Sequence, residues 1–99
     1  IPDSAAIDIT KREAVIAGRR ILLAPLECGV LSALIKAEGS ILSRDQLMQQ
    51  VWGEKQYEVG SNVLEVVMLS LRRKLGEHAK AVVTVRGLGY RYCDLPRLR

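Results

Sequence analysis

Residues 62–93 read NVLEVVMLSLRRKLGEHAKAVVTVRGLGYRYC, and this stretch decides the fold. Its first part carries apolar residues at the spacing i, i+4, i+7 and i+11, which predicts one buried helix face: Leu64, Met68, Leu71 and Leu75. Gly76 is a suitable helix end. Two β-prone runs then flank the turn residues Arg86 to Gly89, so we expect a helix over 62–75 followed by a β-hairpin over about 82–93.

A second helix is predicted upstream by a capping box. Ser43 and Gln46 have the S-x-x-Q spacing in which each side chain caps a backbone N–H of the first turn. We expect this helix to run from Arg44 to about Trp52. The polar residues that follow, 53–61, predict a loop between helices.

A third helix is predicted to begin at Pro25 and to end at Gly39, with an apolar stripe between them. Glu27 stands where the second half of a capping box would be. The cap position itself holds Ala24, which lacks an oxygen acceptor worth about 1 kcal/mol.

Before this helix, three short apolar or alternating runs predict a small antiparallel sheet: Ile7 and Ile9, Ala14 to Ile16, and Ile21 to Leu23. The segment 1–6 has no periodicity and is interpreted as a linker remnant. The order of elements is therefore a sheet, three helices and a hairpin, an α+β arrangement.

Composition supports one domain, because 99 residues, 48% of them hydrophobic, suffice for a single core. We assign it to residues 7–95, with 96–99 as a tail. No apolar run is long enough to span a membrane, and we expect a cytoplasmic protein. The two cysteines lack metal-ligand spacing, so we expect thiols, no metal and no cofactor.

The net positive charge of the chain lies in residues 60–99. Residues 1–59 hold seven Lys and Arg against eight Asp and Glu, whereas residues 60–99 hold eight against three. This asymmetry fits either a footprint for nucleic acid or an ordinary solvated surface.

Catalytic chemistry has little support in the sequence. The single histidine, His78, lies in a polar loop without a predicted partner, which favours an exposed structural role. The Gly87-Leu88-Gly89 segment joins two strands, whereas a phosphate-binding loop leads from a strand into a helix. We therefore expect no enzyme.

Four motifs occur in order along the chain: LAPLE at 23–27, ILSRDQL at 41–47 with VWG at 51–53, LRRKL at 71–75, and TVRGLGYR at 84–91. From about residue 7 to residue 93, the chain resembles the OmpR/PhoB class of response-regulator effector domains. The resemblance implies a winged helix-turn-helix with a four-stranded amino-terminal sheet, one strand more than we predict. Ile41-Leu42 or a split near the start is a candidate for the fourth strand.

The resemblance also implies partners. We expect the chain to bind double-stranded promoter DNA. The helix over 62–75 would lie in the major groove and the wing over 82–93 at the minor groove. The loop over 53–61 is expected to touch RNA polymerase or its sigma factor. A homodimer on DNA and an amino-terminal receiver domain in the full-length protein complete the expectation.

Matched position by position, the resemblance implies phosphate contacts at Arg44, Trp52, Arg72, Thr84 and Tyr90. Partial core packing is the alternative role for the two aromatic residues. The resemblance also implies that Arg86 is the wing arginine that enters the minor groove.

The 62–75 helix departs from the family pattern, because several positions that are commonly basic or polar there are apolar here. Four residues project away from the buried seam, and some of them must face solvent or DNA: Val63, Val66, Val67 and Leu69. We expect Val63 and Val66 to pack on thymine methyl groups. Hydrogen bonds to bases or phosphates are expected from Asn62, Glu65 and Ser70.

An alternative function follows from the same departure. A winged helix with weakened DNA reading could use its apolar helix face for a protein partner or for dimerisation. A second departure is Cys28, where the family has an aromatic residue, so we expect altered packing at this place.

Overall fold

The computed structural model describes residues 6–16 and 18–93. Ala6 already belongs to the first strand, so the expected linker is shorter than 1–6. Its other residues, 1–5, and the expected tail over 96–99 lie outside the described residues. The domain limits therefore remain predictions.

The amino-terminal sheet has three antiparallel strands: β1 (Ala6–Asp8), β2 (Glu13–Ile16) and β3 (Arg19–Leu22). Ala14 and Ile16 of β2 are buried, whereas their neighbours in the strand are only partly covered. This alternation matches the period-two pattern of the sequence. Among the described residues the sheet has the three strands that the pattern predicted and not the four of the resemblance.

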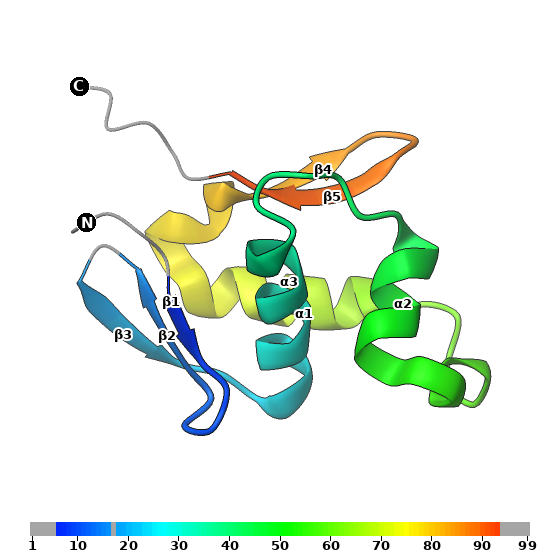
Figure 1. The fold of residues 1–99 in the computed structure, drawn as a ribbon, viewed down its shortest axis with the longest axis horizontal. Coiled ribbons are helices and arrows are strands. Elements are labelled where there is room, and N and C mark those ends of the chain that lie inside the picture. The colour runs from blue at the N-terminus through cyan, green and yellow to red at the C-terminus, as the bar shows by residue number, and fades with distance from the viewer. Residues whose placement is uncertain (1–5, 17, 94–99) are drawn as a thin grey trace.

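Three helices follow, α1 (Pro25–Lys36), α2 (Arg44–Trp52) and α3 (Val63–Leu75). Figure 1 shows α1 and α3 crossing between the sheet and α2. α2 has the predicted bounds and its predicted capping box, with Ser43 Oγ accepting from the Gln46 backbone N–H at 3.0 Å. α1 ends before Gly39, because Glu38 and Gly39 both take positive φ values.

Two short 3-10 helices were not predicted. The segment expected as a loop between α2 and α3 begins with η1 (Gly53–Tyr57), and η2 (Gly76–Ala81) follows α3. His78 lies in η2, and its side chain is only 18% exposed, so the expectation of an exposed histidine was wrong. It lies 3.9 Å from a Glu77 carboxylate oxygen.

The carboxy-terminal hairpin consists of β4 (Val82–Val85) and β5 (Gly89–Tyr92). It lies along one edge of the molecule, above α1 and α3 in Figure 1. Leu42 forms a bridge with Tyr90 through two backbone hydrogen bonds, of 2.8 and 2.9 Å. The candidate fourth strand therefore pairs with the hairpin and not with the amino-terminal sheet. The whole arrangement is a winged helix.

The core is formed by residues from all three helices, the sheet and the hairpin. The predicted seam of α3 is buried, and every one of its residues is at most 2% exposed: Leu64, Met68, Leu71 and Leu75. Val67 is also buried, at 8% exposure. The expectation that Val67 projects away from the core was wrong, because the covered face of α3 is wider than the seam alone.

Cys28 is buried at 3% exposure, as a small side chain in the place of the expected aromatic residue. Beside it an open hollow of about 400 Å³ is lined by residues of α1, α2 and the β1–β2 turn, among them Cys28 and Gly29. The hollow is consistent with altered packing at this place.

Within residues 6–16 and 18–93, no helix combines the length and the apolar composition that crossing a membrane requires.

Candidate nucleic-acid interface

The outer face of α3 is free of contacts with the core. Asn62, Val66, Leu69 and Arg73 are exposed and follow one another at the spacing i, i+4, i+7 and i+11, so they share one side of the helix. Val66 and Leu69 are 56% and 54% exposed. Val63, by contrast, is partly buried and packs against the core. The face is therefore apolar at its middle and polar or basic at its ends.

Ser70 lies on the side of α3 that meets α1. Its hydroxyl donates to the carboxylate of Glu27, which is only 4% exposed. Lys74 Nζ lies 2.8 Å from the same carboxylate, and the Ala24 backbone N–H donates to it at 2.8 Å. In this arrangement the Ser70 hydroxyl hydrogen is engaged inside the protein and is not offered to a base.

These contacts also explain how α1 begins without a polar cap residue. The half of the capping box supplied by Glu27 forms, and the half that Ala24 cannot supply is absent. Burial raises the pKa of Glu27, but the hydrogen bonds from Lys74, Ser70 and Ala24 together hold that pKa below its ordinary value. The carboxylate thus links the start of α1 to the second half of α3.

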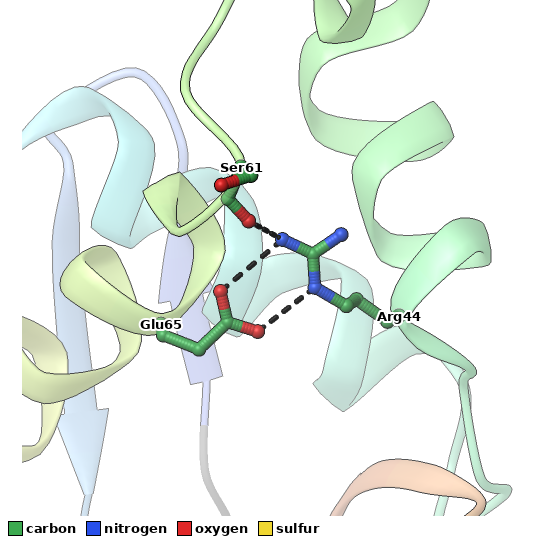
Figure 2. Close-up of polar contacts among 3 residues, drawn as sticks. All are labelled: Arg44, Ser61 and Glu65. Carbon is green, nitrogen blue, oxygen red and sulfur yellow. Dashed lines mark hydrogen bonds and ion pairs between the residues drawn. The ribbon is translucent and has the colours of Figure 1, made fainter.

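Arg44, at the start of α2, reaches across to the first turn of α3. Its Nε donates to Glu65 Oε2 at 2.8 Å, its Nη2 donates to Glu65 Oε1 at 3.2 Å, and Nη2 also donates to the Ser61 carbonyl. Figure 2 shows the third nitrogen, Nη1, pointing away from both partners. The hydrogen bond with Arg44 is the main reason why the pKa of Glu65 lies below its ordinary value.

Arg72, in the last turns of α3, joins this helix to the hairpin. Its Nη2 donates to the Val82 carbonyl at 2.9 Å and to Thr84 Oγ1 at 2.8 Å. Thr84 is exposed, and its hydroxyl keeps its own hydrogen for another acceptor because it accepts from Arg72. The contact brings two of the predicted phosphate ligands together.

A groove of about 350 Å³ lies between the start of α2 and the hairpin. Arg44, Thr84 and Tyr90, three of the predicted phosphate ligands, are among its lining residues. Tyr90 and Trp52 are partly buried and pack against the core, as their alternative role implied. Trp52 is not among the groove-lining residues.

The tip of the hairpin carries Arg86 and Leu88, which are both exposed. The turn is closed by the Leu88 backbone N–H, which donates to the Val85 carbonyl at 2.9 Å. Arg86 makes no ion pair with the residues that the structure describes. Its guanidinium is thus available at the tip of the hairpin.

Two residues of the exposed α3 face were not assigned to the site from the sequence, Leu69 and Arg73. The signal that identifies both residues is the periodicity of the seam itself. The positions opposite a buried i, i+4, i+7 series form an exposed series with the same spacing.

Residues 18–92 match the family model described as "Transcriptional regulatory protein, C terminal". The chain belongs to this family. The OmpR/PhoB-type resemblance of the sequence is thereby confirmed, and the family consists of non-enzymatic transcription factor domains. The family description places the matching domain at the carboxyl end of transcriptional regulatory proteins.

Among the relatives of this Transcriptional regulatory protein C-terminal domain is the transcriptional regulatory protein CutR of Streptomyces coelicolor. It is 41% identical over 85 residues, which cover 86% of the chain and 38% of CutR. The response regulator protein PmrA of Pseudomonas aeruginosa is 39% identical over 84 residues, covering 85% of the chain and 37% of PmrA. The chain thus spans less than half the length of these relatives.

Among solved structures, this C-terminal domain is similar to the DNA-binding domain of Klebsiella pneumoniae RstA, determined in complex with the RstA box. The TM-score is 0.74 at 26% identity, and the similarity covers 93% of each chain. The winged-helix fold found here is therefore the fold of a domain that has been seen on DNA.

Proposed function

We propose that the chain is the DNA-binding output domain of a bacterial response regulator and that it regulates transcription by binding double-stranded promoter DNA. The observation that carries this proposal is the uncovered outer face of α3 beside a hairpin whose tip offers Arg86. An α-helix fits the major groove, and a hairpin beside it reaches the adjacent minor groove.

The anchoring contacts are proposed for the groove between α2 and the hairpin. Arg44, Thr84 and Tyr90 line this groove together with the acidic Asp45. Arg44 Nη1 takes no part in the contacts with Glu65 and Ser61 (Figure 2), and the Thr84 hydroxyl keeps its own hydrogen. Such donors match the phosphate contacts that fix a protein on a duplex. Two further residues complete the predicted set of phosphate ligands. Arg72 lies in α3 and contacts the hairpin, and Trp52 is the last residue of α2.

Base reading is proposed for the exposed face of α3. Asn62 and Glu65 offer polar groups there, and Val66 offers an apolar contact for thymine methyl groups. Leu69 and Arg73 extend this face. Val63 and Ser70, the other two residues that the sequence placed in the site, would need to turn outward from their present contacts to reach DNA.

Further partners of the whole protein are also proposals. The segment 53–61 is assigned to RNA polymerase or a sigma factor, supported by Tyr57, an aromatic side chain that is 84% exposed. An amino-terminal receiver domain is supported by the greater length of the relatives. We place the protein in the cytoplasm as a homodimer on DNA.

A second function, a protein-interaction or dimerisation module, is favoured by one observation. Val66 and Leu69 are large exposed apolar side chains on the face that would enter the groove. The basic residues around this face argue for DNA, because a purely apolar partner has no use for Arg86 or for the free donors of Arg44.

A titration of the chain against random-sequence and promoter duplexes at two salt concentrations, about 50 and 200 mM, separates these functions. We expect log affinity to fall linearly with log salt concentration, by about 0.9 for each phosphate contacted. Absence of duplex binding even at the lower salt concentration, together with self-association, would establish the interaction module instead.

A further inference from the structure

Glu65 is an exposed carboxylate in the first turn of α3, beside the face that the proposed function places against DNA, where a free negative charge would repel phosphates. The structure resolves this conflict by pairing it with Arg44. Each carboxylate oxygen accepts one hydrogen from the guanidinium, so both oxygens are fixed in position. The side chain of Glu65 nevertheless stays 47% exposed.

A carboxylate held in this way keeps room for further hydrogen bonds. Two oxygens together offer about four lone-pair directions, and Arg44 uses two of them. An ionised carboxylate accepts and never donates. It therefore favours base edges that present a donor and rejects those that present only acceptors.

In the major groove this requirement selects among the four bases. Guanine presents two acceptors and thymine presents an acceptor and a methyl group, so neither offers a hydrogen to Glu65. Adenine offers its N6 amino group but places the N7 acceptor beside it, and cytosine offers its N4 amino group alone. A carboxylate is thus best matched by cytosine.

We propose that Glu65 is a specificity-determining residue that selects a cytosine in the major groove, and that Arg44 is the positioning residue that orients its carboxylate. This inference rests on the proposed DNA-binding function. It changes the role of Arg44, whose Nε and Nη2 donate to Glu65 while only Nη1 points away from Glu65 and Ser61 (Figure 2).

The test is a selection of duplexes from a random-sequence pool by the 99-residue chain, followed by titration of the selected motif with each base pair at every position. In Glu65→Ala, we expect one cytosine position to lose its preference, with a loss of discrimination of about five-fold or more. In Glu65→Gln, the same position should shift toward adenine, because an amide pairs with adenine N6 and N7.

Arg44→Lys tests the positioning role. Lysine keeps the charge but lacks the rigid, planar pair of N–H donors that fixes the orientation of the carboxylate, so the cytosine preference should weaken while the salt dependence of binding stays the same. Glu77→Gln is the matched control, because it removes one carboxylate from an exposed ion pair, with Arg19 at 3.0 Å, that lies in η2 beyond the end of α3 and does not involve Glu65 or Arg44. It should leave base preference unchanged.

The outcomes are distinct. If the native chain binds no duplex, the proposed function fails. If the native chain binds DNA without preference, or if Glu65→Ala and Arg44→Lys select the same bases as the native chain with the same discrimination, only the role of Glu65 is overturned. Far-ultraviolet circular dichroism of each variant establishes that a changed preference does not come from a lost fold.

Discussion

Gly89 and Leu42 lie so close together that a Cβ atom on Gly89 would stand 2.1 Å from the Leu42 carbonyl oxygen. This oxygen accepts from the Tyr90 backbone N–H at 2.9 Å, and the Leu42 N–H donates to the Tyr90 carbonyl at 2.8 Å. The absence of a side chain at position 89 therefore allows the hairpin to join the segment that leads into α2.

The first prediction concerns this approach. Gly89→Ala should lower the free energy of unfolding by about 1–3 kcal/mol more than Gly87→Ala, because the added methyl group meets backbone atoms that cannot yield by a rotamer change. Gly87→Ala is the control. Gly87 also has a positive φ, of 79°, but an added Cβ would meet nothing within 4 Å, so only the backbone strain of about 1–2 kcal/mol remains. Urea denaturation compares the two, and equal losses would contradict the close approach.

The second prediction tests the two faces of α3 with the same substitution. Leu71 is fully buried, and Leu71→Ala should cost about 2–5 kcal/mol of stability. Leu69 is 54% exposed, and Leu69→Ala should change stability by no more than about 0.5 kcal/mol. Thermal unfolding of both variants measures the difference. A larger loss in Leu69→Ala would mean that the helix face is wrongly assigned.

The third prediction concerns the pH dependence contributed by Glu27. Its pKa in the folded chain lies below the ordinary value of 4.5, so the charged form stabilises the fold above that pH. This contribution is lost as the pH falls through the folded-state pKa. Glu27→Gln should therefore lose less stability than the native chain on acidification from neutral pH to about pH 3.

Urea unfolding at several pH values provides this comparison, with Glu58→Gln, an exposed carboxylate after η1, as the control for the loss of one acidic group. The control should keep the pH dependence of the native chain. Parallel curves for the native chain and Glu27→Gln would contradict the role assigned to the contacts from Lys74 and Ser70.

The fourth prediction concerns the tip of the hairpin. Arg86→Ala should weaken duplex binding several-fold. The slope of log affinity against log salt concentration should become smaller by about 0.9, the value for one cation that no longer neutralises a phosphate. Arg20→Ala removes an equal charge from an exposed position in β3 and should change binding little. Fluorescence anisotropy at several salt concentrations measures both. Equal affinities for Arg86→Ala and the native chain would remove the hairpin from the interface.

The fifth prediction concerns the apolar part of the α3 face. If Val66 packs on a thymine methyl, replacing that thymine by uracil should weaken binding about four-fold, the equivalent of about 0.8 kcal/mol for one buried carbon. The uracil scan should have no further effect in Val66→Ala, which lacks the contact. Undiminished affinity of the native chain for every uracil duplex would favour the protein-interaction function.

The fold was largely predictable because its determinants are local and periodic. The seam of α3, the capping box at Ser43 and the glycine-bearing turn at residues 86–89 each leave a signal in adjacent positions. The two 3-10 helices lack such a signal. Their short hydrogen-bonded turns leave too few repeats for a periodicity to emerge.

The site was predictable in its positions but not in its contacts. Pairs such as Arg44 with Glu65, and Ser70 with Glu27, lie 21 and 43 residues apart in the sequence. No local pattern identifies partners at such separations, because only the tertiary fold, in which α1 packs against both α2 and α3, brings them together. The burial of Val67 has the same origin. The four residues of the seam show which side of α3 is covered but not how wide the covered face is.

One guanidinium nitrogen of Arg72 donates to both the Val82 carbonyl and Thr84 Oγ1. This pair of contacts restricts how the two elements can move. It clamps the end of α3 to β4, so the helix and the hairpin cannot slide past each other without breaking two hydrogen bonds. If α3 and the hairpin enter neighbouring grooves as proposed, we expect the domain to favour duplex sequences that fit the spacing of these two elements, or deform to it, at low cost.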